Sequence, residues 1–202
     1  MGQRGQKKQY IQKITSKDEK MLKAFRCCGY LTKDMLKEKL AMSDHRIENF
    51  KRDKYIEKIA YADKTQNQVI ETYRLTNAGK DFLEKQLGLS NCYRSTSISH
   101  DIEVAQKYMN CSETERESWK TESKLREQFD EISDALLAEN RFEEYDRLQE
   151  YLQENDVSAI DGSYISDETG LEMSAEVVTD SYGRAEIEAK ITFCHIMNIH
   201  QN

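Results

Sequence analysis

Proline is absent from the 202 residues, and glycine occurs only eight times. No helix is therefore interrupted by a proline ring, and turns depend on Gly, Asn, Asp and Ser. No apolar run approaches the roughly 18–20 residues of a membrane-spanning helix, and no signal-peptide core follows the polar N-terminus. We therefore expect a soluble, cytoplasmic protein with no membrane partner.

The sequence also lacks a metal-binding cysteine or histidine pattern. Its cysteines are an odd, scattered set without a CxxC pair, which favours reduced thiols over a disulfide framework. His195 and His200 are five residues apart, one too many for a pair on one helix face, so no zinc site is predicted. The five cysteines are Cys27, Cys28, Cys92, Cys111 and Cys194.

The net charge of −7 conceals two halves of opposite sign. Residues 1–90 contain 20 Lys and Arg against 12 Asp and Glu, and residues 91–202 contain 10 against 25. A basic half beside an acidic half indicates that the first half meets a polyanion and the second does not.

Three short helices are predicted within the first 55 residues. Ser16, with Glu19 three positions later, has the spacing of a capping box and begins a helix over 17–28. Thr32 and Ser43 are the predicted N-caps of the next two helices. Short turns between these helices are typical of a helix-turn-helix.

A hairpin and a fourth helix follow. Residues 55–61 and 69–75 alternate between apolar and polar side chains, as strands do, and Thr76 then caps a helix over 77–87. The segment YRLTNAGKDFLEK resembles the end of the wing and the next helix in many bacterial winged-helix proteins. Residues 15–88 are therefore predicted to form a winged helix-turn-helix, preceded by a flexible basic arm over 1–14.

In a winged helix the third helix enters the major groove of DNA and the wing contacts an adjacent groove. Arg pairs with guanine and Asn with adenine, so the face opposite Ile47 and Phe50 is the predicted reading face. Its residues are Ser43, His45, Arg46 and Asn49. The predicted backbone and groove contacts are Lys51, Arg52 and Lys54 after this helix and Lys64, Gln66, Asn67 and Gln68 at the wing tip, with Arg4, Lys7 and Lys8 in the arm.

The second half begins after a polar linker, residues 89–99, and combines helices with strands. A helix is predicted from Ser99 to about Asn110. The apolar stripe in residues 112–155 indicates a helical hairpin that turns near Asn140. Two strands, over 159–165 and 171–179, and a helix from Arg184 to the end complete a domain that is either α+β or α/β.

Four short motifs occur in order in this half: SHDIEVA, SWKTESKLR, AIDGSYI and AEVVTDSYGRAEIEAKITF. The series resembles the replication-relaxation family of plasmids and conjugative elements, whose members join a winged helix to a domain like the PD-(D/E)XK nucleases. The resemblance implies an α+β protein in which residues 100–202 form a small α/β domain of degenerate nuclease fold. The matching positions are His100, Asp101, Trp119, Glu122, Asp161, Glu176 and Lys190.

These positions define a candidate catalytic site. Asp161 and Glu176 supply carboxylate oxygens suited to Mg²⁺, and Glu122 supplies a third. Lys190 is placed to stabilise charge on a phosphate or to orient water. In active nucleases of this fold the lysine stands two residues after the strand glutamate, where this chain has Val178. We therefore favour a binding protein that requires no cofactor, and an Mg²⁺-dependent endonuclease is the alternative.

The favoured function is sequence-specific binding of double-stranded DNA by an accessory protein of a mobile element. The expected role is in plasmid replication, in conjugative transfer or in their regulation. The acidic domain is expected to form a homodimer or to recruit a replication or transfer protein. A plain transcriptional repressor remains a further alternative.

Overall fold

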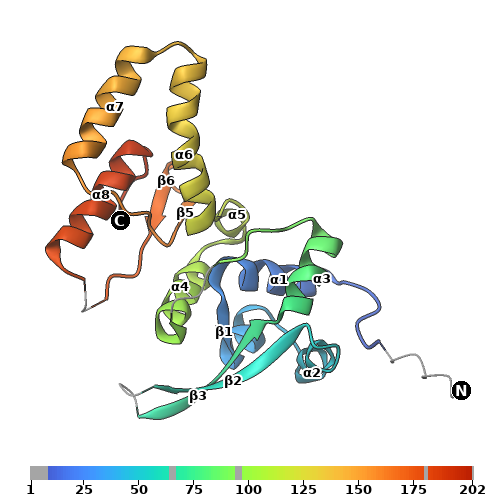
Figure 1. Ribbon diagram of the computed structural model, residues 1–202. Helices are drawn as coiled ribbons and strands as arrows, with labels where there is room; N and C mark the ends of the chain where they lie inside the picture. Colours follow the sequence, from blue (N-terminus) through green and yellow to red (C-terminus); the bar gives the residue numbers. More distant parts are fainter. Residues whose placement is uncertain (1–8, 64–66, 94–96, 180–181, 202) are drawn as a thin grey trace, which may run out of the picture. The chain divides into compact units, whose positions relative to one another are not determined.

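The computed structural model describes residues 9–63, 67–93, 97–179 and 182–201. The chain divides into two compact units, Met1–Ile102 and Glu103–Asn202, and the division lies inside the helix α4 (Ile98–Asn110). Each unit combines helices with a three-stranded antiparallel sheet, so the chain is α+β as predicted (Figure 1). Over the described ranges, every helix is too short or too polar to span a membrane.

The first unit follows the predicted order of helices and hairpin, with one short strand added. Its elements are α1 (Ser16–Cys28), β1 (Tyr30–Thr32), the π-helical turn η1 (Met35–Lys39), α2 (Asp44–Arg52), β2 (Ile56–Asp63), β3 (Gln68–Leu75) and α3 (Asn77–Leu87). The sheet order is β1-β3-β2. The added strand β1 therefore joins the edge of the predicted hairpin, with Leu31 opposite Tyr73.

Three of the four predicted helix caps are confirmed. The hydroxyl of Thr32 accepts a hydrogen bond from the Met35 amide, and Ser43 and Thr76 cap α2 and α3 in the same way. The predicted capping box of α1, Ser16 with Glu19, is wrong. Thr15 is the N-cap, and Asp18, not Glu19, returns the bond to the Thr15 amide at 2.7 Å. The physical reason is that α1 begins at Ser16, which puts Asp18 in the third helical position.

The core of the first unit lies between the helices and one face of the sheet. A close approach fixes α3 on the start of the hairpin, because a Cβ on Gly79 would lie 1.9 Å from the carbonyl oxygen of Tyr55. The Tyr55 ring stacks on Phe82 with centroids 4.0 Å apart. The large side chains that are fully buried in this unit include Met21, Leu22, Phe25, Leu31, Leu36, Phe50, Ile56 and Leu83.

The described part of the predicted arm, residues 9–14, is attached to the first unit. Ile11 is buried, and the amides of Tyr10 and Ile11 donate to the carboxylate of Asp53 at 2.7–3.1 Å. Burial of one apolar side chain and a charged acceptor for two amides hold this segment in place. The basic side chains Arg4, Lys7 and Lys8 lie outside the described residues.

The second unit has an antiparallel sheet in the order β4-β5-β6, which makes it α+β rather than α/β. After α4, its elements are α5 (Glu113–Glu117), β4 (Lys120–Thr121), α6 (Glu122–Ala138), α7 (Phe142–Glu154), β5 (Gly162–Ile165), β6 (Glu172–Ala175) and α8 (Arg184–Ile196). The last helix does not run to the end of the chain. Asn198 takes a φ of 54°, and His200 then pairs with the edge of β6 through Glu172 and Ser174.

The predicted helical hairpin is confirmed. Helices α6 and α7 run side by side, and Asn140, with a φ of 59°, lies in the turn between them (Figure 1). The core beneath the sheet contains Leu125, Ile160 and Phe193. Trp119 is a packing residue, since it is buried between the rings of Tyr108 and Tyr164.

Candidate functional site

Helix α2 does not present all of its predicted reading residues to solvent. Ser43 and His45 are exposed, but Arg46 points to α1. Its Nε lies 2.9 Å from Oδ1 of Asp18, and its Nη2 lies 2.7 Å from Oδ2 and 2.7 Å from the carbonyl oxygen of Lys13. Asn49 is only 7% exposed, with its amide nitrogen 3.5 Å from Nδ1 of His45. Arg46 and Asn49 therefore belong to the inner side of α2.

The ion pair of Arg46 changes the chemistry of Asp18, whose side chain is fully buried. Burial by itself raises the pKa of this carboxyl group. The hydrogen bonds from Arg46 and Thr15 outweigh that effect, so the pKa of Asp18 lies below its ordinary value. Asp18 is thus a charged anchor that fixes α2 against the start of α1.

The basic residues that follow the reading face remain near the surface. Lys51 pairs with Glu48 at 2.8 Å, and the Arg52 guanidinium lies over the ring of Tyr10. Lys54 is exposed, with a φ of 61° just after the helix. The phosphate contacts predicted for these three residues stay a prediction, and Lys51 and Arg52 offset the charge of the acidic Glu48 beside them.

Two lysines outside the predicted set border the N-terminus of α2. Nζ of Lys17 donates to the carbonyl oxygen of Ala41 at 3.3 Å, in the turn before the helix. Nζ of Lys37 pairs with Asp44, the first residue of α2, at 2.7 Å. The sequence feature that could have identified them is a lysine on each of the two helical segments that precede α2. Because amide groups at a helix N-terminus attract anions, this arrangement suits a phosphate.

The predicted wing corresponds to the β2–β3 hairpin, whose tip is partly outside the described residues. Lys64 and Gln66 fall there, whereas Asn67 and Gln68 are described and exposed. Asn67 has a φ of 50°, in the left-handed region that asparagine tolerates in turns. Nearer the base, hydrogen bonds from Lys58 and Tyr73 lower the pKa of Glu71 to about 2. This carboxylate therefore stays charged and binds the two strands together.

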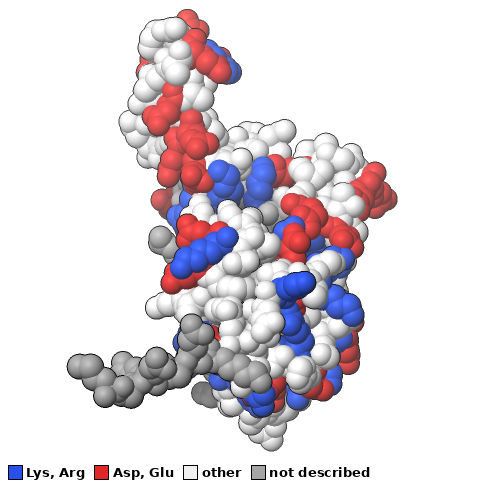
Figure 2. Space-filling view, turned by 90° about the vertical axis from the view of Figure 1, so that its right-hand side faces the viewer, with Lys and Arg blue, Asp and Glu red and all other residues white. Residues whose placement is uncertain are grey.

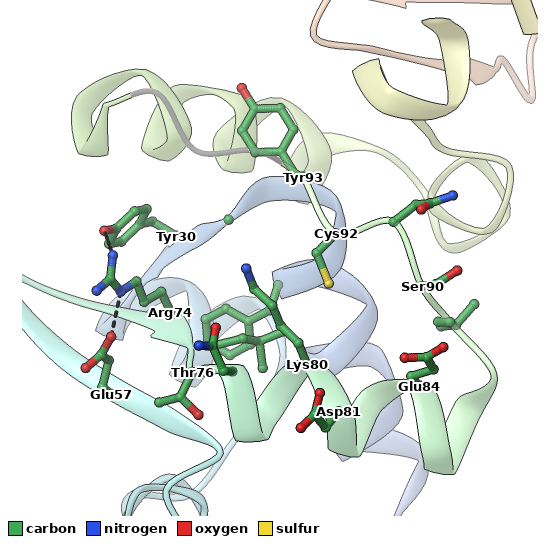
Figure 3. Close-up of a pocket in the computed structure, with 16 residues that line it drawn as sticks. Tyr30, Glu57, Arg74, Thr76, Lys80, Asp81, Glu84, Ser90, Cys92 and Tyr93 are labelled. Atoms are coloured by element: carbon green, nitrogen blue, oxygen red, sulfur yellow. Dashed lines mark hydrogen bonds and ion pairs between the residues drawn. The ribbon is translucent and has the colours of Figure 1, made fainter. Parts of the chain in front are cut away.

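A pocket of about 850 Å³ lies on the first unit, beside α3 and β3 (Figure 3). On one side of it, Arg74 lies between Glu57 at 2.7 Å and the Tyr30 hydroxyl at 3.0 Å. Lys80, Asp81 and Glu84, from one face of α3, also line it, as does the segment from Ser90 to Tyr93. The lining contains two cations and three carboxylates, so it favours no ligand of one charge.

The predicted linker contributes to this pocket and is attached to α1. The Tyr93 amide donates to the carbonyl oxygen of Arg26 at 2.7 Å, and Nε of Arg26 donates to the carbonyl oxygen of Ser90 at 2.7 Å. His100 and Asp101 follow at the start of α4. Asp101 is fully buried against Gly29, and its Oδ1 lies 3.8 Å from Nδ1 of His100. This motif thus packs on the end of α1.

In the second unit, three of the four predicted catalytic residues come together. The Asp161 amide donates to Glu176 at 2.9 Å, and the Val177 amide donates to Oδ2 of Asp161 at 2.9 Å. Nζ of Lys190 lies 2.9 Å from Oε1 of Glu176 and donates to the carbonyl oxygen of Ala159 at 2.9 Å. The two carboxylates take the place of ladder hydrogen bonds beyond the end of β6, which explains why this strand is shorter than predicted.

The same contacts determine the electrostatics of this cluster. Burial raises the pKa of Glu176, the neighbouring Asp161 raises it further, and Lys190 opposes both. Glu176, Lys190 and Tyr182 border a pocket of about 210 Å³ whose other lining is largely apolar. Burial and the nearby carboxylates also raise the pKa of the Tyr182 hydroxyl. The ion pair between Glu176 and Lys190 is therefore largely buried.

The carboxylates that the resemblance assigned to Mg²⁺ are paired with Lys190 and with main-chain amides in this structure. Both oxygens of Glu176 and one of Asp161 already accept a hydrogen bond or an ion pair, and Lys190 supplies the positive charge. The carboxylate of Glu122 pairs with Arg126 at 2.7 Å, while its amide donates to the carbonyl oxygen of Asp161. Among the described residues, no three His, Cys, Asp or Glu side chains are grouped to hold a metal.

Comparisons of the chain with protein families, curated proteins and solved structures gave no match.

Proposed function

We propose that residues 15–88 form a winged helix-turn-helix that binds double-stranded DNA, with α2 in the major groove and the β2–β3 hairpin as the wing. The order of helices and strands supports this proposal, since a hairpin follows three helical segments and a further helix closes the unit. The basic balance of residues 1–90 supports it as well, because phosphate contacts dominate the affinity of DNA-binding proteins.

The N-terminus of α2 carries the proposal. Lys17 and Lys37 flank the exposed end of a nine-residue helix whose cap, Ser43, is also exposed. A DNA phosphate at this position would meet Lys17 and the helix amides, and Lys37 would exchange its Asp44 partner for the phosphate. In this arrangement the exposed His45 faces the DNA bases and the exposed Lys54 faces the DNA backbone. The inward Arg46 and Asn49 hold the helix in position.

The biological role is proposed on the motif series in the second half. We propose that the chain serves as an accessory protein of a mobile element, recognising an origin or an operator. The second unit is proposed to dimerise or to recruit a replication or transfer protein. The direct pairing of Lys190 with Glu176 supports a binding role over cleavage of DNA, because the lysine takes up the charge of a carboxylate that a metal would need.

The test uses the full chain and duplex DNA from around its own gene, with and without Mg²⁺. We expect selective binding that leaves the DNA intact in both conditions. The variant Lys17→Ala/Lys37→Ala should bind about tenfold or more weakly, since it loses two phosphate contacts. Lys80→Ala/Lys85→Ala removes the same charge from exposed positions on α3 and should bind like wild type.

Three results would contradict the proposal or a part of it. Equal losses in the two double variants would show that net charge, and not the α2 surface, determines binding. Cleavage that requires Mg²⁺ and disappears in Glu176→Ala would establish the nuclease alternative. Binding only beside its own promoter, without any contact to replication or transfer proteins, would keep the DNA-binding proposal but replace the recruitment role with that of a repressor.

A further inference from the structure

The second unit has a small pocket beside the ion pair of Glu176 and Lys190, bordered by α8 and by residues that follow β6. Its volume is about 210 Å³. A water molecule takes up about 30 Å³ in the liquid, so the pocket has room for about seven or eight non-hydrogen atoms. Pockets that bind drug-sized molecules are larger, at roughly 300–1,000 Å³. The pocket therefore suits a small molecule.

The wall of this pocket is apolar, and part of it is uncovered. Ile160 belongs to the core of the unit, whereas Val178, Ile187 and Ile191 are 63%, 38% and 46% exposed. Ile187 and Ile191 are four residues apart on α8, so both lie on the same face of the helix. A ligand with apolar atoms against these three side chains removes apolar surface from water on both sides of the contact.

The charged residues of the lining leave one cation without a partner. They are Lys107, Glu176 and Lys190. Glu176 and Lys190 neutralise each other, because Nζ of the lysine lies 2.9 Å from Oε1 of the glutamate. Lys107 is exposed and lies on the part of α4 that belongs to the second unit. It forms no ion pair or hydrogen bond with any residue that the structure describes. The pocket thus combines one available positive charge with an apolar wall.

We propose that this pocket binds a small carboxylic acid with a short apolar chain. Its carboxylate pairs with Nζ of Lys107, and its chain lies against Val178, Ile187 and Ile191. An amine of the same size meets Lys107 as a like charge, and an uncharged molecule leaves this cation without a partner, so both fit less well. The inference goes beyond the proposed DNA binding and recruitment, and it depends on neither.

The charge of the whole unit determines the conditions of the test. Residues 91–202 contain 25 Asp and Glu against 10 Lys and Arg, and Figure 2 shows acidic side chains along the α6–α7 hairpin. This excess weakens the binding of any anion at low salt. At about 0.15 M salt the Debye length is about 8 Å, so carboxylates farther than that from the ligand are largely screened, whereas Lys107 lies beside it.

The experiment titrates hexanoate into the full chain at that salt concentration and follows the backbone amide signals by NMR. We expect saturable shifts at Val178, Ile187 and Ile191, with a dissociation constant of about 1 mM for a ligand of this size. Acetate has the same charge without the chain, and hexylamine has the chain with the opposite charge. Both should bind at least about tenfold more weakly than hexanoate.

Two pairs of variants assign the contacts. Lys107→Ala should weaken hexanoate binding about fivefold, whereas Lys124→Ala removes the same charge from α6, outside the lining, and should weaken it less than about twofold. Ile191→Ala should also weaken binding about fivefold. Leu137→Ala removes a similarly exposed apolar side chain outside the lining and should bind like wild type. All four side chains are partly exposed, so the variants should remain folded.

Three outcomes would overturn the inference. The first is hexylamine binding as tightly as hexanoate, because Lys107 would then not select the charge of the ligand. The second is equal weakening by Lys107→Ala and Lys124→Ala, or by Ile191→Ala and Leu137→Ala. The third is a titration without saturable shifts at Val178, Ile187 and Ile191.

Discussion

The guanidinium of Arg46 on α2 forms a two-pronged ion pair with the buried carboxylate of Asp18 on α1, at 2.9 and 2.7 Å. Asp18 also receives the amide and the hydroxyl of Thr15, both at 2.7 Å. One buried carboxylate thus joins the cap of α1 to the helix proposed to enter DNA. The angle and position of α2 depend on this contact.

Removal of Arg46 should destabilise the first unit more than it affects recognition directly. Arg46→Ala leaves Asp18 buried without its cation, which costs roughly 3 kcal/mol. Arg52→Ala, on the exposed end of the same helix, should cost less than about 1 kcal/mol. Urea unfolding followed by circular dichroism measures both values. Similar costs for the two variants would show that the Asp18 contact does not anchor α2.

Asp18 should also make the first unit sensitive to acid. Its pKa is lowered in the folded state, so its contribution is present above the unfolded pKa of about 3.9 and is lost as pH falls through the folded pKa. Asp18→Asn should therefore show a smaller loss of stability than wild type as the pH is lowered from 5 towards 2. Parallel stability curves for the two proteins would contradict the assigned pKa direction.

Glu176 should contribute with the opposite sign. Burial and the neighbouring Asp161 raise its pKa, so its contribution is present below the unfolded pKa of about 4.3 and is lost as pH rises through the folded pKa. Relative to Glu176→Gln, wild type should lose stability in that rising interval. The fluorescence of Trp119, the only tryptophan, reports unfolding of the second unit. A stability difference that is constant over the interval would refute this assignment.

Gly79 should tolerate no side chain. A methyl group there would meet the Tyr55 carbonyl oxygen at 1.9 Å, so Gly79→Ala must displace α3 and should cost about 3 kcal/mol. Gly88→Ala is the matched control. Gly88 has a φ of 66° and no atom within 4 Å of an added methyl group, so only backbone strain of about 1 kcal/mol is expected. Thermal unfolding of both variants measures the difference, and equal costs would contradict the close approach.

The helices and the hairpin could be predicted from the sequence because local patterns specify them. Thr32, Ser43 and Thr76 are caps that depend on residues only three positions away. The inward direction of Arg46 could not be predicted in this way, since its partner Asp18 lies 28 positions earlier in the chain. Apolar spacing identifies Ile47 and Phe50 as core residues, but it does not say which flank of the helix meets α1.

The second unit shows the same limit. The motif series brought Asp161, Glu176 and Lys190 to attention, and the structure places them together. These side chains bond to one another and to main-chain groups. The choice of partners depends on the register of β5 and β6 and on the position of α8. The spacing of residues in the sequence specifies neither the register nor the position of α8. It is therefore equally compatible with a cation site and with a buried ion pair.

The most direct test of the DNA-binding proposal is the affinity of the full chain for duplex DNA from around its own gene, measured over a series of salt concentrations. The logarithm of the binding constant should fall linearly with the logarithm of salt, by about 0.9 for each phosphate contact. The slope should become shallower by about 2 in Lys17→Ala/Lys37→Ala and should stay unchanged in Lys80→Ala/Lys85→Ala. No binding above background at low salt would contradict the proposal and make the first unit a protein-interaction module.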